Sequence, residues 1–335
     1  MVSSTFELPL GGGKIWMFTL AHISDPHLGP LPPVRVAELL NKRFFGYLSW
    51  MRRRRDLHRP EVLAALGADL GALAPDHVVV TGDLTNIALL QEFTQVADWL
   101  HGLGTPETVS VVPGNHDAYV AVPWEESLAK WQAFMSSDGG APGVTLGEAG
   151  AGAPAGASPG ASIGGPDGFP FVRYRGPVAI VGLSSAQAPP LFCAHGTLGE
   201  AQLGRRGPLL RRLGEEGWFR VVLIHHPPSL DKIARRKRLV DAAPFRQVIA
   251  ESGAEMVLHG HDHSFGAERI AGPGGGEVPV IGVPSASARR DSKHPVAHYQ
   301  LYGIEKTGNG WRVEVAARGF DPASGRFGEA RRYIL

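Results

Sequence analysis

The sequence lacks the features that mark disulfide-rich, membrane-spanning and secreted proteins. Its 335 residues include one cysteine, Cys193, so no disulfide can form within the chain. No apolar run reaches the length of about 18 residues that a membrane-spanning helix needs. The first ten residues have neither the basic region nor the apolar region of a secretory signal. We therefore expect a cytoplasmic protein without a spanning helix.

The sequence also lacks a strong charge of either sign. Lysine and arginine number 33 and aspartate and glutamate 32, which gives a net charge of +1. A dedicated nucleic-acid binder usually has a clear basic excess, so no stable nucleic-acid partner is expected. The hydrophobic share of 43% is ordinary for a globular protein and allows a sizeable core. We interpret residues 1–335 as a single domain with two insertions.

Short apolar runs alternate with longer segments of helical periodicity. The runs predict buried strands at Met17 to Ile23, Val78 to Thr81, Val109 to Val112, Val221 to Ile224 and Met256 to Leu258. The periodic segments predict helices at Pro60 to Ala74, Leu89 to Leu103, Trp124 to Met135, Leu198 to Leu213 and Ala242 to Ser252. This alternation is typical of an α/β protein with a largely parallel sheet.

The second half of the sequence contains further strand patterns. One begins at Phe171 and continues with Val178 to Leu183. Val278 to Val283, Tyr299 to Ile304 and Trp311 to Ala316 alternate like antiparallel strands, and we expect them to complete a second sheet.

Two segments interrupt this pattern. Residues 138–168 consist mainly of Gly, Ala, Pro and Ser, which bury too little apolar area to offset the entropy of ordering. They are interpreted as a flexible insertion. Residues 33–59, here called the cap, contain an aromatic and basic helical pattern. Its apolar positions are Phe44, Phe45, Tyr47, Leu48, Trp50 and Met51, and its basic positions include Lys42, Arg43 and Arg52 to Arg55.

The pattern of the cap allows two interpretations. In the first, the cap is a helix packed on the domain, with its apolar side chains fully buried and its arginines solvated. In the second, it is an amphipathic lid that receives an apolar substrate tail or makes peripheral contact with an anionic membrane through residues 42–55.

Polar motifs follow the predicted strands. They are Asp25-Pro26-His27, Gly82-Asp83, Gly114-Asn115-His116-Asp117, His225-His226 and Gly260-His261-Asp262-His263. Ligand sites in parallel sheets lie beyond the carboxyl ends of the strands. We also expect the two histidines of the last motif, at i and i+2 on a strand end, to point the same way.

The residue types in these motifs suit a particular class of metal. Carboxylate, imidazole and amide ligands together favour Mn, Fe, Zn or Co over the all-oxygen cage of Ca or the thiolates of structural Zn. Seven candidate ligands are too many for one ion and fit two, with Asp83 as the bridging carboxylate. Two ions about 3.5–4 Å apart can clamp a phosphoryl group and supply hydroxide near neutral pH.

The ordered set of motifs resembles the calcineurin-like metallophosphoesterase family, from about Met17 to Val283 and with residues 138–168 unmatched. The resemblance implies a two-sheet αββα sandwich and binuclear phosphohydrolase activity. It implies one divalent or trivalent ion at Asp25, His27, Asp83 and His263, and a second at Asp83, Asn115, His225 and His261. It also implies that His116 protonates the leaving oxygen and that Asp117 orients His116.

The remaining histidines are assigned by context. We prefer His225 to His226 as the ligand because His225 directly follows the strand, as in related phosphodiesterases with the same His-His-Pro-Pro run. Strand alternation would place His259 on the side of His261, in a supporting role. No motif surrounds four further histidines, for which we expect a surface position or a satisfied polar role: His58, His195, His294 and His298.

The substrate is open within the phosphohydrolase class. The Asn-His-Asp and His-His-Pro-Pro sequences resemble bacterial cyclic-nucleotide and glycerophosphodiester enzymes, which favours a small phosphodiester substrate. The aromatic and basic segment of the cap from Lys42 to Arg55 faintly resembles the lipid-facing insertion of UDP-diacylglucosamine pyrophosphatases, which makes a lipid-linked diphosphate the alternative. A phosphomonoesterase or phosphoprotein phosphatase is less favoured because no additional arginine is evident close to the motifs. A non-catalytic binding module is disfavoured because every motif position is present.

Overall fold

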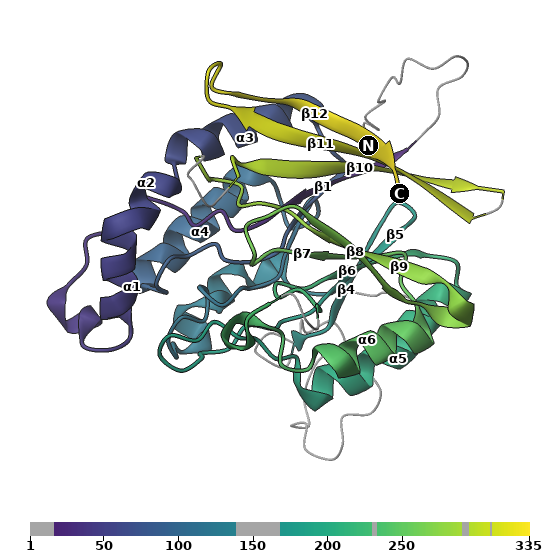
Figure 1. Ribbon diagram of the computed structural model, residues 1–335, viewed down its shortest axis with the longest axis horizontal. Helices are drawn as coiled ribbons and strands as arrows, with labels where there is room; N and C mark the ends of the chain where they lie inside the picture. Colours follow the sequence, from purple (N-terminus) through teal and green to yellow (C-terminus); the bar gives the residue numbers. More distant parts are fainter. Residues whose placement is uncertain (1–16, 139–167, 230–232, 290–294, 309) are drawn as a thin grey trace.

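Two six-stranded sheets form the centre of the fold (Figure 1). The computed structural model describes residues 17–138, 168–229, 233–289, 295–308 and 310–335. The first sheet has the order β12 (Arg326–Ile334), β11 (Gly310–Asp321), β10 (His298–Thr307), β1 (Phe18–Ile23), β2 (His77–Val80) and β3 (Val109–Val111). The second has the order β4 (Phe171–Arg175), β5 (Val178–Gly182), β6 (Phe219–Leu223), β7 (Met256–His259), β9 (Glu277–Gly282) and β8 (Gly266–Ala271).

Both sheets are mixed, with parallel strands at the positions that carry the motifs. In the first sheet β1, β2 and β3 are parallel, whereas β10, β11 and β12 are antiparallel to their neighbours. In the second sheet β5, β6, β7 and β9 are parallel, and the edge strands β4 and β8 are antiparallel. The predicted two-sheet αββα sandwich is therefore confirmed.

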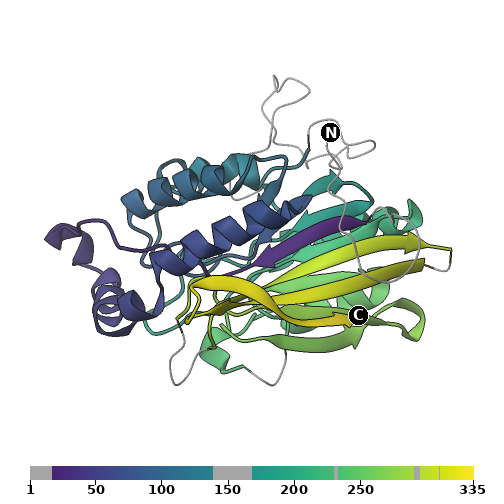
Figure 2. The same ribbon diagram turned by 90° about the horizontal axis from the view of Figure 1, so that it is seen from above.

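Helices pack against the sheets (Figure 2). The four longest helices are α3 (Pro60–Leu73), α4 (Leu90–Leu103), α5 (Gly199–Glu215) and α6 (Ala242–Ser252). The buried faces of α3 and α4 join the same apolar cluster as β1, β2 and β3, whereas α5 and α6 pack on the second sheet. The predicted bounds of α6 are met at both ends, because its buried positions repeat with helical spacing and Gly253 follows it with a positive φ.

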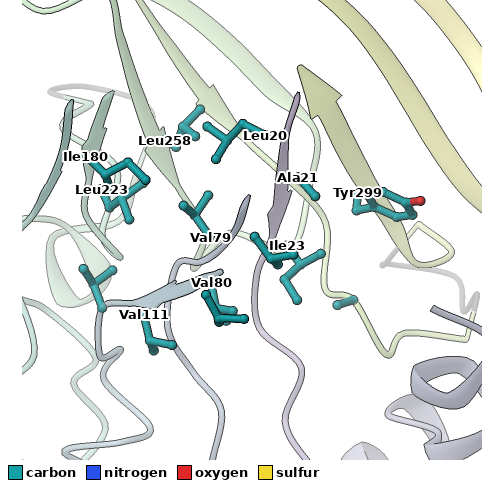
Figure 3. Packing of buried hydrophobic residues seen from close by; sticks show 14 of the residues in the cluster. Leu20, Ala21, Ile23, Val79, Val80, Val111, Ile180, Leu223, Leu258 and Tyr299 are labelled. Atoms are coloured by element: carbon teal, nitrogen blue, oxygen red, sulfur yellow. The ribbon is translucent and has the colours of Figure 1, made fainter. Parts of the chain in front are cut away.

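Alternation along the strands divides the core into two apolar clusters. In β5, Ile180 belongs to the cluster between the sheets, whereas its neighbour Val181 belongs to the cluster under α5 and α6. Figure 3 shows Ile180, Leu223 and Leu258 among the side chains of the first cluster, with those of β1 to β3. Because both faces of the second sheet are covered, its central strands are apolar at nearly every position.

Two expectations about the elements are wrong. Residues 124–135 form two 3₁₀ segments, Trp124–Glu126 and Leu128–Phe134, instead of one α-helix. The hydroxyl of Ser127 donates to the carbonyl of Pro123 at 2.7 Å, and the backbone of Ser127 leaves the helical region. β9 joins the second sheet as expected, antiparallel to β8 and parallel to β7, but β10 and β11 extend the first sheet rather than complete the second. Local alternation identifies a strand but not its partner.

The cap lies at one end of the molecule, where Figures 1 and 2 both place α1 and α2. It consists of a 3₁₀ turn Val36–Leu39, α1 (Arg43–Ser49), a π-helical segment Trp50–Arg54 and α2 (Arg55–Leu57). Its aromatic side chains are not fully buried, since Phe44 and Phe45 are 45% and 44% exposed. The expectation that the cap buries its apolar face as ordinary cover is therefore not met. The predicted insertion at 138–168 lies almost entirely outside the described residues, and its flexibility stays a prediction.

Candidate metal centre

The five predicted motifs lie in loops that follow β1, β2, β3, β6 and β7. The loops of the first sheet are joined by backbone hydrogen bonds. The amide of Asp25 donates to the carbonyl of Gly82, and the amide of His27 donates to the carbonyl of Asp83, both at 3.0 Å. In the second sheet, the amide of Gly260 donates to the carbonyl of His225 at 3.1 Å. The motifs therefore meet at the carboxyl ends of parallel strands, as their positions in the sequence predict.

Asp25, His27, Asp83 and His263 form the first ligand cluster, with their candidate ligand atoms within 4.8 Å of one another. The Nε2 atom of His263 lies 3.1 Å from Oδ1 of Asp25 and 3.2 Å from Nε2 of His27. Nε2 of His27 lies 3.9 Å from Oδ2 of Asp83. Two carboxylates and two imidazoles thus direct their polar atoms into one small space.

Asp83, Asn115, His225 and His261 form the second ligand cluster. Nε2 of His225 lies 3.4 Å from Oδ1 of Asp83, 3.2 Å from Oδ1 of Asn115 and 3.3 Å from Nδ1 of His261. All four side chains are buried. Asp83 therefore presents one carboxylate oxygen to each cluster, which is the arrangement that a bridging ligand requires.

Hydrogen bonds behind the clusters orient two imidazoles. Nδ1 of His27 lies 3.0 Å from the carbonyl of Thr85, and Nδ1 of His225 lies 2.7 Å from the carbonyl of Thr81. Because a carbonyl can only accept, Nδ1–H is the donor and Nε2 of each ring faces the cluster. Burial, and then the neighbouring imidazoles, hold the pKa of His27 and of His261 well below 6.5. Neutral imidazoles at neutral pH are the form that binds metal.

The donor atoms of both clusters fit divalent transition-metal ions. Oδ1 of Asp25 is buried without a hydrogen-bond partner among the described residues. Buried polar atoms normally have partners, and the lone pairs of His27 and Asp83 also face one another without donors between them. Positive ions within the two clusters would satisfy these atoms. Mixed nitrogen and oxygen donors favour transition metals over Ca or Mg.

The structure distinguishes His225 from His226. His226 lies close to His225 and His261, but both of its ring nitrogens have other partners, Nδ1 the hydroxyl of Ser185 at 2.8 Å and Nε2 the carbonyl of Ala194 at 3.1 Å. His225 instead points Nε2 at Asp83 and Asn115. The preference for His225, made because it directly follows the strand, stays a prediction.

Asp117 does not orient His116, contrary to what the resemblance implies. Nδ1 of His116 lies 2.6 Å from the carbonyl of Asn86, which orients the ring. The carboxylate of Asp117 accepts hydrogen bonds from the amides of Leu84, Thr85 and Gly114 at 2.8–2.9 Å. Its buried oxygens are fully used in joining the loops after β2 and β3, so it supports the backbone of the centre.

The motif histidines after β7 also differ from expectation. His261 and His263 lie beyond the strand, with φ of 72° and 51°, so strand alternation does not apply to them. His261 faces His225, and His263 faces Asp25 and His27. They therefore contribute to different clusters instead of pointing the same way.

The backbone of the centre adopts a conformation that L-residues rarely take. Eight non-glycine residues among those described have positive φ, and five of them belong to the clusters. These five are Asp25, His27, Asp83, His261 and His263. Such backbone costs about 1–3 kcal/mol for each residue and persists only where surrounding structure enforces it. Its concentration here supports a functional role for these loops.

No motif or spacing in the sequence predicted that His58 and Arg54 would lie at the centre. His58 follows α2, is buried, and packs on the rings of His27 and His263 with centroids 4.5 and 5.6 Å away. Its Nδ1 lies 2.8 Å from the hydroxyl of Ser287, which agrees with a satisfied polar role but not with a surface position. Arg54 of the cap places Nη1 3.1 Å from Nδ1 of His116.

Arg54 corrects the expectation that no additional arginine lies close to the motifs. It is separated from His116 by 62 residues in the sequence, and no spacing rule relates the two. Only the packing of the cap beside the loop after β2 brings them together, where Arg54 also donates to the carbonyl of Asn86 at 3.4 Å.

The remaining histidines lie outside the clusters. His259 is buried and lines a separate cavity with Lys237 and Glu268, and its Nδ1 lies 3.0 Å from the carbonyl of Gly260. This position does not agree with the supporting role expected beside His261. His195 contacts Gln187, and His298 contacts the carbonyl of Val296. His294 lies outside the described residues.

The helices in the described part of the chain are all too short or too polar to cross a membrane.

A curated relative, a probable cyclic nucleotide phosphodiesterase of Synechococcus sp., is 25% identical over 255 residues, which are 75% of this chain and 80% of the relative.

Solved structures resemble the fold. A dimetal phosphatase of Danio rerio matches with a TM-score of 0.56 and 12% identity, covering 95% of this chain and 98% of its own. A purple acid phosphatase from yellow lupin, Lupinus luteus, matches with a TM-score of 0.51 and 9% identity, covering 95% of this chain and 53% of its own.

The family profile described as calcineurin-like phosphoesterase matches residues 18–265, which include all five motifs. The match covers most of the chain and coincides with the loops that form both clusters. The chain therefore belongs to the calcineurin-like phosphoesterase family.

Proposed function

We propose that the protein is a binuclear metal-dependent phosphodiesterase that acts on a small phosphodiester. The observation that carries this proposal is the shared carboxylate of Asp83, whose two oxygens face the two ligand clusters. Asp25, His27, Asp83 and His263 would hold one ion, and Asp83, Asn115, His225 and His261 the other. Ions held there would supply a nucleophile at neutral pH and stabilise the charge that develops on the phosphoryl oxygens.

His116 is placed to act on the leaving group. Its Nδ1–H is committed to the carbonyl of Asn86, so Nε2, which lies 3.4 Å from Nη1 of Arg54, is the nitrogen that would face a substrate. Burial and the charge of Arg54 lower the pKa of His116 to about 4, although Asp83 opposes them. A phosphoryl anion bound beside the ring would raise this pKa and favour protonation of Nε2. As the bond from phosphorus to the leaving oxygen breaks, the Nε2 proton passes to that oxygen.

The preference for a diester over a monoester is supported by the curated relative, whose name is that of a probable cyclic nucleotide phosphodiesterase. Phosphodiesters carry one negative charge and need both a nucleophile and help for the leaving oxygen. The two clusters and His116 would provide these functions together.

A lipid-linked diphosphate is a second candidate substrate, favoured by the exposed side chains of the cap. Val36 and Leu40 are 80% and 81% exposed, and Phe44 and Phe45 are about half as exposed. The neighbouring Arg52, Arg53 and Arg55 are also exposed. Apolar side chains beside basic ones are complementary to an anionic membrane surface, where each basic residue contributes about 1 kcal/mol.

The bridging role of Asp83 predicts the metal content. Purified protein supplemented with Mn²⁺ should hold close to two metal ions per chain by elemental analysis. Asp83→Asn should lower occupancy of both clusters, because each loses a carboxylate oxygen. Asp262→Asn is the matched control, since this exposed motif aspartate is outside both clusters. One ion per wild-type chain after supplementation would contradict the binuclear centre.

The role of His116 predicts a separation of activity from metal content. His116→Ala should lower kcat for bis(p-nitrophenyl) phosphate by roughly 10²–10⁴-fold, the usual effect of losing a general acid. Metal content should stay near that of the wild type, because His116 is assigned to neither cluster. Loss of metal together with activity would show that His116 has been assigned the wrong role.

The hydrogen bonds of Asp117 predict an effect on stability. Asp117→Ala removes the acceptor for three buried amides, and it should lower the free energy of unfolding by about 1–3 kcal/mol or more. Chemical denaturation measures this change, with Asp262→Ala as the control. An unaltered midpoint would argue against a role in joining the loops.

The exposed cap predicts vesicle binding if the lipid-linked substrate is correct. The protein should sediment with anionic phospholipid vesicles, and the bound fraction should fall as salt rises. Leu40→Ser with Phe44→Ser should abolish sedimentation, whereas Phe265→Ser, which alters an exposed phenylalanine far along the chain, should not. Absence of binding at low salt would remove the support for this second candidate.

A further inference from the structure

A cavity of about 520 Å³ lies beside His116, between the cap and the loop at residues 191–193. Lys42, Arg52, Arg53 and Arg54 contribute to its lining, and His116 is at one side of it. The cavity therefore begins at the residue proposed to protonate the leaving oxygen and extends under the cap. A leaving group attached to a phosphoryl group at the metal centre would enter this space.

The charge of the cavity is uncompensated. Among the residues that the structure describes, its lining has four cationic side chains and no aspartate or glutamate. The two acidic residues of the cap are each beside another arginine: Glu38 lies 3.3 Å from Arg35, and Asp56 lies 3.8 Å from Arg55. Glu92, near Arg54, accepts hydrogen bonds from three backbone amides.

The four cations of the lining are placed by different contacts. Lys42 donates to the carbonyl of Pro189 at 2.8 Å, and its Nζ lies 4.4 Å from the centre of the Tyr119 ring. Arg54 is fixed by the carbonyls of Gly46 and Asn86. Within the described ranges, Arg52 and Arg53 have neither a salt bridge nor a side-chain hydrogen bond and are exposed to the cavity and solvent. They are therefore available to a ligand.

Aromatic rings bound the same space. The ring of Tyr119 stacks on the ring of His116, with their centroids 5.6 Å apart. The ring of Phe45 packs edge-on against that of Phe192, with their centroids 5.4 Å apart, and both line the cavity. The contact between Phe45 and Phe192 joins the cap to the loop that follows β5. The walls are thus suited to a flat or apolar group, whereas the cations are suited to a negative charge.

We propose that this cavity is the leaving-group subsite and that it selects phosphodiesters whose leaving group carries a second negative charge. The proposal rests on the proposed function, because it takes His116 to face the leaving oxygen. Arg52 and Arg53 supply the selectivity. Arg54, next to His116, lies nearest the bond that breaks.

A matched pair of chromogenic esters tests this inference on the full-length, Mn²⁺-supplemented protein. Ethyl 4-nitrophenyl phosphate and ethyl 3-carboxy-4-nitrophenyl phosphate differ by one carboxylate on the leaving phenol. The measured quantity is the ratio of kcat/KM for the carboxylated ester to kcat/KM for the uncharged one. Intrinsic reactivity of the two esters cancels when this ratio is compared between protein variants.

The double variant Arg52→Gln/Arg53→Gln should lower this ratio about fivefold or more relative to the wild type. Arg55→Gln is the control, because Arg55 is an exposed arginine of the same segment that does not line the cavity. It should keep the ratio within about twofold. Raising NaCl from about 50 to about 300 mM should lower the wild-type ratio, since salt screens the attraction.

The outcomes separate this inference from the proposed function. Hydrolysis of both esters with the same ratio in the wild type and the double variant would overturn the subsite and leave the phosphodiesterase intact. A wild-type ratio that is insensitive to salt would also overturn the subsite. Hydrolysis of neither ester by the metal-supplemented wild type would overturn the proposed function itself. The salt series uses the wild type alone, so it stands even where the double variant does not fold.

Discussion

The carboxylate of Asp83 is the point at which the two ligand clusters meet, and the geometry of the whole centre depends on its position. One oxygen faces His27 and the other faces His225. The loops after β1, β2, β3 and β6 must therefore approach one carboxylate closely. Gly82, with φ of 93°, allows this approach, because a Cβ there would lie 2.6 Å from the amide of Gly114 and 2.7 Å from Nδ1 of His225. A Cβ at Gly114 would in turn collide with Asp83.

The sandwich supplies the rigidity that such crowded loops require. Five of the candidate ligands have positive φ, and that backbone is unfavourable unless the elements on either side hold it. The strands that precede the loops are fully buried at almost every position and lie in both apolar clusters. The carboxylate of Asp117 then joins two of the loops through their amides. Packing energy in the core thus maintains strain at the edge of the sheets.

The cap contributes arginine side chains beside the centre. The loops provide metal ligands and His116, but no cationic side chain directed at a substrate. Arg54 reaches His116 from the π-helical segment, and its guanidinium is held by two carbonyls. The same segment leaves Arg52 and Arg53 at the adjacent cavity. The candidate metal ligands and the cationic side chains of the cavity therefore come from different parts of the chain.

Much of the fold and of the centre could be predicted from the sequence because the relevant signals are local. Apolar runs predicted the strands that carry Asp25, Asp83 and Asn115, and their shared orientation predicted that these residues would meet. The buried face of α6 repeats within eleven residues, so both of its ends could be located.

Only the tertiary structure decided the interactions between distant segments. Alternating residues identify β10 as a strand, but its pairing with β1 depends on contacts across more than 270 residues. No spacing rule predicts that Asp117 accepts hydrogen bonds from amides of the loop after β2. Likewise, none predicts that the ring of His58 packs on that of His27. The position of Arg54 depends on how the cap packs. The sequence by itself determined the ligand types and their strands, whereas side-chain partners were decided by packing, because hydrogen bonding and burial depend on proximity in space.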